Sequence, residues 1–227
     1  LSACFVGISF FRAVDKKNVW ASVAQVFDER GEGVIVQGGN ARIDKDDRSP
    51  HLSSEDSARL VIEALAAYRR EHRTPPARLV VHKTSYFSTY EREAMLAAAD
   101  NIDVVELINV RRGGLRLFRE GTYPVLRGTA IAFDETRGSI FLRGSVPQFQ
   151  TYPGMYVPAP LEFERAAGES SPREIALELL DLSKLNFNNT QFDGAEPVTV
   201  RAARKVGDIL KHVDQNRTGH SGFRFFT

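Results

Sequence analysis

The chain has 227 residues, of which 42% are hydrophobic and 26% charged, a composition typical of a globular protein with one large α/β domain or two small ones. Its 30 basic and 29 acidic side chains nearly cancel, so any surface that binds a polyanion must be local. The single cysteine, Cys4, excludes a disulfide framework and a cysteine-rich zinc site, and a reducing cytoplasm fits this cysteine usage. No apolar run in the sequence reaches membrane-spanning length.

The first half of the chain alternates strands with helices after an initial hairpin. Five segments carry the patterns of strands: residues 3–12, 18–28, 34–39, 78–85 and 101–110. Ser53, followed by Asp56, is typical of a helix start, and a second helix is predicted over 88–99. The apolar stripe of the first helix comprises Leu60, Val61, Ala64, Leu65 and Tyr68. The polar run 40–51 is predicted to be a loop, and the whole order favours an α/β fold with a mixed sheet.

The second half is less regular. A strand is predicted within 138–146, and the proline-rich segment 151–163 is extended or turning rather than helical. A helix is predicted over 170–185, with Ser171 as its cap and Pro172 at the first helical position. The last helix, over about 199–213, carries its apolar residues on one side: Val200, Ala203, Val206, Leu210 and Val213.

Several of these stretches, taken in order, resemble the PIWI domain of prokaryotic Argonaute proteins. They are CFVGISFF (4–11), PARLVVHKTS (76–85), LRGTAIAF (126–133), TYPGMYVPAPLEF (151–163), the segment LSKLNFNNTQFDGAEPVTVRAARKVGDILKHV (182–213) and the aromatic end GFRFFT. The resemblance covers nearly the whole chain, so residues 1–227 are expected to form one PIWI domain. It implies an α/β ribonuclease-H-like fold, a mixed central sheet with flanking helices, which holds a guide strand and its complementary target. It also implies a MID domain upstream of Leu1, which would make this chain the C-terminal part of a longer polypeptide.

The resemblance further implies where an active PIWI domain holds its two catalytic metal ions. Two Mg²⁺ ions roughly 4 Å apart repel each other by on the order of 16 kcal/mol at an effective dielectric of about 20, so several carboxylates must offset that repulsion. At the positions of the first two family aspartates this sequence has Ser9 and Thr84, and at the fourth catalytic position it has Arg204. The family's catalytic glutamate is expected around 48–55, where Glu55 occupies a first helical turn that favours acids anyway. The sequence therefore predicts a catalytically inactive PIWI domain, of the short or the inactive long subgroup.

Two polar segments are candidates for binding the guide and target. The last predicted helix carries basic residues away from its apolar side: Arg201, Arg204, Lys205 and Lys211. The preceding NFNNTQ segment contains side-chain amide donors, and the resemblance implies that they contact guide phosphates. They are Asn186, Asn188, Asn189 and Gln191. The alternative interpretations are a solvated basic helix face and an ordinary polar loop. Whether the guide is RNA or DNA stays open, because no sequence motif shows contacts to a 2′-hydroxyl.

The resemblance gives the C-terminal carboxylate of Thr227 a further role, in holding a Mg²⁺ ion that contacts the guide 5′-phosphate. The alternative is that the terminal aromatic residues only complete the core. The histidines show no spacing typical of zinc ligands, and Glu91 and Glu93 are interpreted as solvated acids of the helix over 88–99.

Three functions follow from these observations. The first is guide-dependent nucleic-acid binding without cleavage, in prokaryotic defence against plasmids or phage through a partner effector such as a sirtuin-like protein, a TIR-type protein or a nuclease. The second is an active metal-dependent nuclease whose ligands come from other acids, with Asp15, Asp44, Asp46, Asp47 and Asp103 as candidates. The third is a domain that binds only proteins.

Overall fold

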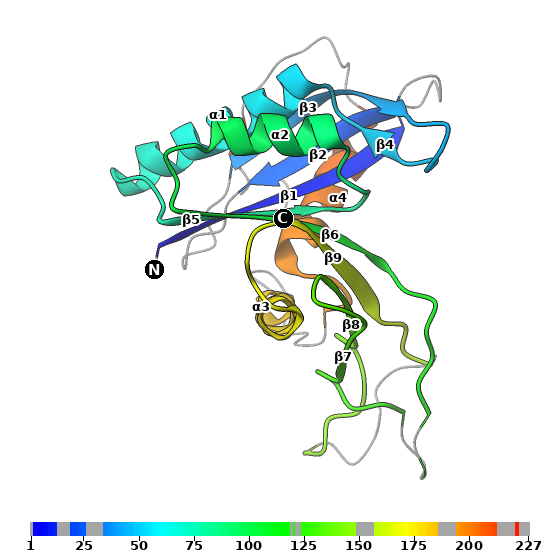
Figure 1. The fold of residues 1–227 in the computed structure, drawn as a ribbon. Coiled ribbons are helices and arrows are strands. Elements are labelled where there is room, and N and C mark those ends of the chain that lie inside the picture. Colours follow the sequence, from blue (N-terminus) through cyan, green and yellow to red (C-terminus); the bar gives the residue numbers. More distant parts are fainter. Residues whose placement is uncertain are drawn as a thin grey trace. The chain divides into compact units, whose positions relative to one another are not determined.

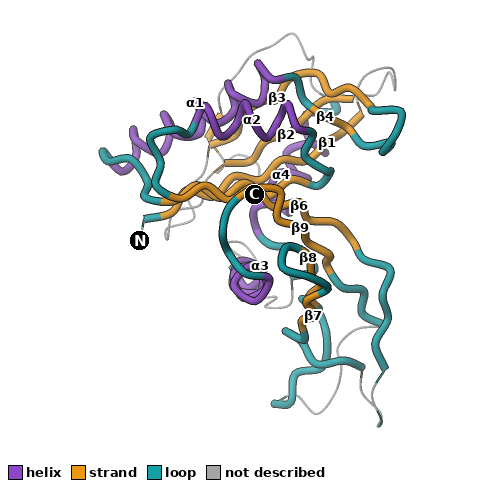
Figure 2. Tube along the Cα trace, in the orientation of Figure 1, coloured by secondary structure: helices purple, strands orange, loops and turns teal. Residues whose placement is uncertain are grey.

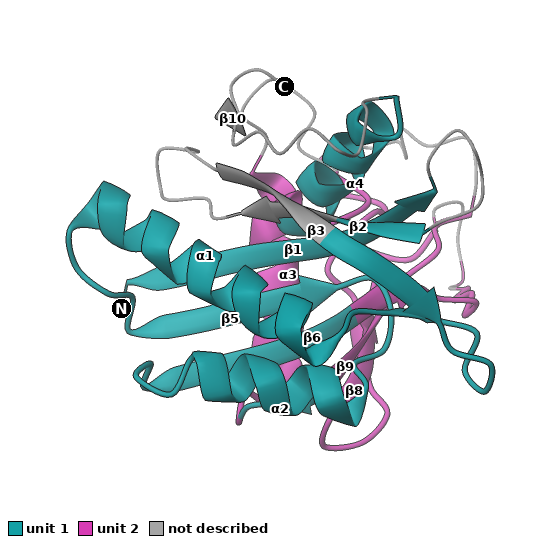
Figure 3. Ribbon diagram, turned by 90° about the horizontal axis from the view of Figure 1, so that it is seen from above, with its two compact units in different colours: residues 1–109, 166–168, 199–227 teal, residues 110–165, 169–198 magenta. Residues whose placement is uncertain are grey.

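The structure is a computed structural model in which the chain forms two compact units (Figures 1 and 3). It describes residues 2–12, 19–25, 34–118, 120, 124–148, 157–185, 194–212 and 221–222. Unit 1 comprises residues 1–109, 166–168 and 199–227, and unit 2 comprises residues 110–165 and 169–198. The distribution of helices and strands along the trace is shown in Figure 2.

The sheet of unit 1 is mixed. Its central strand β1 (Ala3–Arg12) pairs antiparallel with β2 (Val19–Gln25) on one side and parallel with β5 (Arg78–Lys83) on the other. Beyond β5 the parallel order continues with β6 (Val104–Arg112), and beyond β2 the antiparallel order continues with β3 (Val34–Ile43). Two short strands also pair with β3: β4 (Pro50–His51) and β10 (Ser221–Gly222). The predicted α/β class with a mixed central sheet is confirmed.

Helices cover both faces of this sheet (Figures 1 and 3). One face packs against α1 (Ser54–His72) and α2 (Thr89–Ala98), and all five residues of the predicted apolar stripe of α1 are buried in this core. The opposite face packs against α4 (Val198–Leu210). Because side chains alternate along a strand, Cys4, Val6 and Ile8 of β1 enter the α1–α2 core whereas the residues between them face α4. Each large aliphatic side chain buried in this way stabilises the fold by roughly 1.5–3 kcal/mol.

Unit 2 is an antiparallel meander with one helix. Strand β8 (Arg137–Ile140) pairs with β7 (Ala130–Ala132) and with the part of β9 (Leu161–Ala167) that belongs to this unit. Helix α3 (Pro172–Lys184) packs against β7 and β8. Ser171 caps it as predicted. The Ser171 hydroxyl accepts a hydrogen bond from the backbone N–H of Glu174 at 3.3 Å, and the Glu174 carboxylate accepts one from the backbone N–H of Ser171.

Some sequence-based boundaries are wrong. The segment 40–51 is not a continuous loop, because β3 runs on to Ile43 and β4 begins at Pro50, which leaves a tight turn over 44–49. The backbone N–H of Asp44 donates to the carbonyl of Ser49 across that turn at 3.0 Å. Strand β8 is shorter than the strand predicted within 138–146, and β7 was not predicted. No helix in the part of the chain that the structure describes is long and apolar enough to span a membrane.

Candidate functional site

Ser9 and Thr84 lie side by side where the parallel pairing of β1 with β5 ends. Ser9 follows Ile8, whose register partner on β5 is Lys83, and the backbone N–H of Thr84 donates to the carbonyl of Ile8 at 3.1 Å. The Ser9 side chain is buried and Thr84 is half-buried. The structure therefore brings together the two positions that the sequence identified separately, although they are far apart along the chain.

Helix α4 packs directly on the face of the sheet that carries these two residues. A Cβ atom on Gly7 would overlap the backbone carbonyl of Thr199, so the helix approaches β1 closely only because position 7 is glycine. The Nδ1 atom of His82 on β5 lies 2.9 Å from the Thr199 hydroxyl oxygen. Ser9 lies two residues after Gly7, and Thr84 two residues after His82, so all four positions lie on the α4 face.

Burial keeps His82 neutral at this junction. The ring is completely buried, and removal from water, with a smaller contribution from the charge of Arg78, lowers the pKa of His82 to about 3. Its Nε2 atom is buried and has no hydrogen-bond partner, whereas Nδ1 contacts Thr199. His82 is therefore a structural contact between β5 and α4 that carries no charge at neutral pH.

The predicted basic residues of α4 lie away from the sheet. Val200, Ala203 and Val206 are buried, whereas Arg204 and Lys205 are exposed and Arg201 is half-buried. The Lys211 ammonium lies 3.0 Å from the carboxylate of Asp208, one turn earlier. Arg204 thus belongs to the helix that covers the Ser9 face, but it lies on the exposed side of that helix, next to the fully buried Ala203.

On the opposite face of the sheet, a buried ion pair lies next to Thr84 in the sequence. Lys83 is completely buried, and its ammonium lies 2.6 Å from the carboxylate of Glu91 and donates to the Tyr86 carbonyl at 2.7 Å. The ammonium also lies over two aromatic rings, 5.5 Å from the centroid of Phe10 and 5.0 Å from that of Phe87. The interpretation of Glu91 as a solvated acid is wrong, because the residue is completely buried; Glu93 is exposed, as predicted.

The Glu91 carboxylate has further partners from the segment that leads into α1. It accepts from the backbone N–H of Leu52 at 2.7 Å and lies 2.9 Å from Nδ1 of His51, whose Nε2 is 2.8 Å from the Asp47 carboxylate. It also accepts from the N–H of Ser88, the cap of α2, at 2.8 Å. The network therefore fixes the end of the 44–49 turn and the start of α2 against the end of β5. The capping pair Ser88 and Glu91 could be recognised from the sequence, but its burial could not.

The two charges of this pair stabilise each other against burial. Removal from water lowers the pKa of Lys83 to about 8, although the negative charge of Glu91 opposes that shift. Burial alone would raise the pKa of Glu91, but the charge of Lys83 and the backbone hydrogen bonds from Leu52 and Ser88 hold it below its usual value. Both residues are therefore charged at neutral pH, and their ion pair holds the start of α2 against the end of β5, next to the candidate site.

No protein-family model matches the chain, and no curated protein matches it in sequence. Solved structures do match it. The Argonaute of Clostridium butyricum, bound to a guide DNA and a 19-mer target DNA, superposes with a TM-score of 0.73 and 15% identity over 99% of this chain and 29% of its own. The chain has the fold of an Argonaute PIWI domain.

Two structures of the Argonaute of Marinitoga piezophila share this PIWI fold. One is in complex with a guide RNA that has a 5′ hydroxyl, with a TM-score of 0.65 and 14% identity over 90% of this chain and 29% of its own. The other also contains a target DNA, with a TM-score of 0.64 and 13% identity over 93% of this chain and 31% of its own. The chain thus spans less than a third of the length of these Argonautes, and at such low identity the likeness shows the fold alone.

In this PIWI fold, the residues at the candidate site do not fit a pair of magnesium ions. The hydroxyls of Ser9 and Thr84 are neutral ligands, and Arg204, at the fourth position that the resemblance gives, is a cation on the exposed side of α4. Hard divalent ions close to each other need several anionic oxygens. Within the residues that the structure describes, no group of three or more His, Cys, Asp or Glu side chains is arranged to hold a metal ion.

The other acids proposed as metal ligands have local roles or are solvated. The Asp44 carboxylate accepts from the backbone N–H of Asp46 at 2.7 Å, which stabilises the 44–49 turn, and Asp47 contacts His51. Asp46, Asp103 and Glu55 are exposed. Asp15 lies outside the described residues.

The remaining candidate residues of the PIWI fold also lie outside the described part of the chain. They are Asn186, Asn188, Asn189 and Gln191 of the polar segment and Thr227 at the C-terminus. Their roles in contacting the guide and in holding a guide-dependent Mg²⁺ ion stay predictions.

Proposed function

We propose that this chain is a PIWI domain that binds a guide strand and its complementary target without cleaving the target. The observation that carries the proposal is the side-by-side placement of Ser9 and Thr84, fixed by the hydrogen bond from the Thr84 N–H to the Ile8 carbonyl. Two neutral hydroxyls side by side cannot offset the repulsion between two Mg²⁺ ions, which is on the order of 16 kcal/mol. Arg204, which is exposed on α4, is a cation and cannot serve as an anionic metal ligand.

Retained binding is supported by the chemistry of α4. A nucleic-acid duplex that is recognised through its backbone needs cations and N–H donors, not acids. Arg204 and Lys205 are exposed on the helix, and the amides of 186–191 precede it in the sequence. The Argonautes with the same fold were solved with guide and target strands bound, which also supports this proposal.

We propose that another protein acts once the target has been recognised. A partner effector, sirtuin-like, TIR-type or a nuclease, supplies that output in cytoplasmic defence against plasmids or phage. An upstream MID domain seats the guide 5′ end, and the Thr227 carboxylate contributes to a Mg²⁺ ion at the 5′-phosphate. These roles extend the first proposal and come from the PIWI resemblance.

The test uses the complete native polypeptide with 5′-phosphorylated guide RNA or guide DNA and a labelled complementary target. We expect target retention that requires the guide, weakens with salt, and leaves the target intact in Mg²⁺ and in Mn²⁺. Cleavage that is abolished by Asp44→Asn, Asp46→Asn or Asp47→Asn would show an active nuclease instead. Absence of target retention, together with absence of short copurified strands, would show a domain that binds only proteins.

Charge reversal tests the contribution of α4. We expect the variant with Arg204→Glu and Lys205→Glu to bind guide and target more weakly, with a shallower dependence of log K on log salt by about one for each lost phosphate contact. Arg70→Glu, on the exposed side of α1, is the matched control and should leave the salt dependence unchanged. If log K depends on log salt with the same slope in both variants, α4 does not contact the phosphates of the guide or target.

A further inference from the structure

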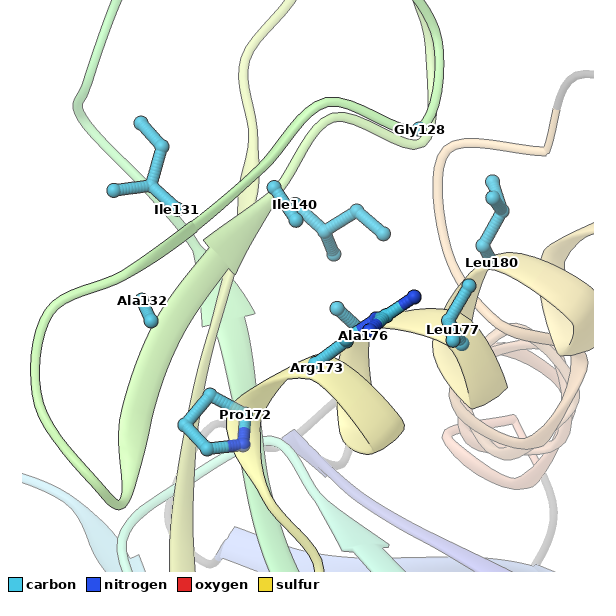
Figure 4. A pocket seen from close by; sticks show the side chains of 10 residues that line it. Gly128, Ile131, Ala132, Ile140, Pro172, Arg173, Ala176, Leu177 and Leu180 are labelled. Carbon is cyan, nitrogen blue, oxygen red and sulfur yellow. The ribbon is translucent and has the colours of Figure 1, made fainter.

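An apolar groove of about 350 Å³ lies within unit 2, between strand β7 and helix α3 (Figure 4). The strands line it with Ala130, Ile131, Ala132 and Ile140, and helix α3 lines it with residues that include Ala176, Leu177 and Leu180. Three of the lining residues, Ala130, Ala132 and Ala176, have side chains of a single methyl group. Leu177 is 51% exposed, and Phe133, directly after β7, is 50% exposed.

Among the residues that the structure describes, the strand that borders this groove has no neighbour on its outer edge. β7 is the last strand in the sheet order, and within the described residues it pairs only with β8. Backbone hydrogen bonds from Phe141 to Thr129 and from Phe133 to Arg137, both 2.9 Å, flank Ile131 on the β8 side. Because antiparallel pairs alternate, the N–H and C=O groups of Ala130 and Ala132 point away from β8.

The open edge and the groove are arranged to act together. Ala130 lies directly opposite Ile140 in the antiparallel register, so both side chains are on the face that packs against α3. A strand added beside β7 would bond to the backbone of Ala130 and Ala132 and place every second side chain on that same face. Those side chains would enter the groove and cover Leu177.

The groove also has a charged rim. Arg173, in the first turn of α3, lines it and is exposed. No ion pair is formed by Arg173 within the described ranges of the chain. A cation beside an apolar groove favours an occupant that brings a carboxylate next to its apolar residues.

We propose that the β7 edge and this groove bind an extended segment of a partner protein, which adds to the sheet as a strand. The segment carries apolar residues at alternate positions, which enter the groove, and an acidic residue that pairs with Arg173. This surface belongs to unit 2 and its proposed role does not depend on guide binding. A helical occupant is disfavoured because it would satisfy its own backbone and leave the outward groups of Ala130 and Ala132 without partners.

The test selects a random dodecapeptide library on the immobilised complete protein, with the Leu177→Glu variant used to remove peptides that bind elsewhere. We expect enriched peptides with apolar residues spaced two apart and an acid nearby. Their affinity should fall at least tenfold with Leu177→Glu and several-fold with Arg173→Glu. Ile62→Glu is the matched control, because Ile62 is 56% exposed on α1 and outside unit 2.

N-methylation of the enriched peptide tests the strand addition itself. Methyl groups on one alternate set of amides should abolish binding, and methyl groups on the other set should not, because only one set faces β7. Three results would overturn the proposal: no enrichment over Leu177→Glu, apolar spacing of three and four residues, or equal effects of both methyl sets. A dimer in sedimentation that Leu177→Glu dissociates would assign the groove to a second copy of the chain instead. Guide binding should be equal in all these variants, which separates this test from that of the proposed function.

Discussion

The Glu91 carboxylate is bonded by residues at the ends of three elements of unit 1. They are Leu52, directly after β4, Lys83, the last residue of β5, and Ser88, the cap of α2. A buried charge is tolerated only when such partners are complete, since removal of one partner leaves the other charge uncompensated. The stability of this region therefore depends on a single side chain.

Glu91→Gln should lower the free energy of unfolding by about 3–5 kcal/mol, because it leaves the completely buried Lys83 without a counter-charge. Glu93→Gln, an exposed position on the same helix, should change it by less than about 0.5 kcal/mol. Urea denaturation at pH 7 measures both. Similar values for the two variants would mean that Lys83 is hydrated or neutral in solution.

His82 predicts a loss of stability on acidification. Its pKa is lowered to about 3 by burial, from an ordinary value near 6.5, so between these values the unfolded chain binds a proton that the folded chain does not. The contribution of neutral His82 to the free energy of unfolding is fully present well above pH 6.5. It falls as the pH falls, by about 2 kcal/mol at pH 5. His82→Gln should remove this part of the pH dependence, whereas His212→Gln, an exposed position, should retain it. An unchanged slope in His82→Gln would contradict the assignment.

At the scale of elements, the contact between β1 and α4 depends on the absence of a side chain. Gly7→Ala places a Cβ against the Thr199 carbonyl, a backbone atom that can move only with the helix. We expect a loss of about 1–3 kcal/mol or more in the free energy of unfolding. Gly114→Ala is the matched control, because a Cβ there meets no atom within 4 Å. Thermal denaturation compares them, and equal midpoints would mean that α4 does not pack closely on β1.

Local signals were sufficient for several elements and insufficient for others. The caps Ser53 and Ser171 and the apolar stripe of α1 depend on residues a few positions apart, so the sequence predicts them directly. The extension of β3 beyond Gly39 to Ile43 was missed because paired glycines followed by polar residues indicate a turn. In the structure a Cβ at Gly39 would overlap the Asp56 side chain of α1, so this glycine serves close packing. Strand β7 was missed because the short sequence Ala-Ile-Ala has little strand propensity.

At the candidate site, too, some features can be predicted from the sequence and others cannot. The proximity of Ser9 and Thr84 follows from the parallel pairing of β1 with β5, in which Ile8 lies opposite Lys83; the sequence predicts both strands and their parallel order. The burial of Glu91 results from contacts with Lys83 and His51, and no local spacing encodes such contacts. The exposed orientation of Arg204 depends on how α4 sits on Gly7, which only the packed structure determines.

At the scale of the whole molecule, introducing aspartates at the positions of Ser9 and Thr84 should not by itself produce nuclease activity. The variant with Ser9→Asp and Thr84→Asp places two carboxylates side by side, but it supplies no catalytic glutamate, and at the fourth position it keeps Arg204, a cation on the exposed side of α4. We expect no cleavage of a guided target in Mg²⁺ or Mn²⁺, and a lower stability because the two like charges repel each other. The matched variant Ser9→Asn with Thr84→Asn has similar size without charge. Cleavage by the double aspartate variant alone would contradict the account of this site.

The pairing of β1 with β5 has a consequence for how the protein is made. Ser2 and Ala77, bonded where these strands begin, are 75 positions apart, and the cover over Gly7 comes from Thr199. During synthesis the β1–β2 pair can form early, but Ser9 gains its neighbour only when Thr84 has left the ribosome. The face beneath α4 stays uncovered until α4 has been synthesised, and an incompletely covered sheet is a target for aggregation or chaperone binding. We therefore expect the nascent chain to be most prone to aggregation before α4 is synthesised.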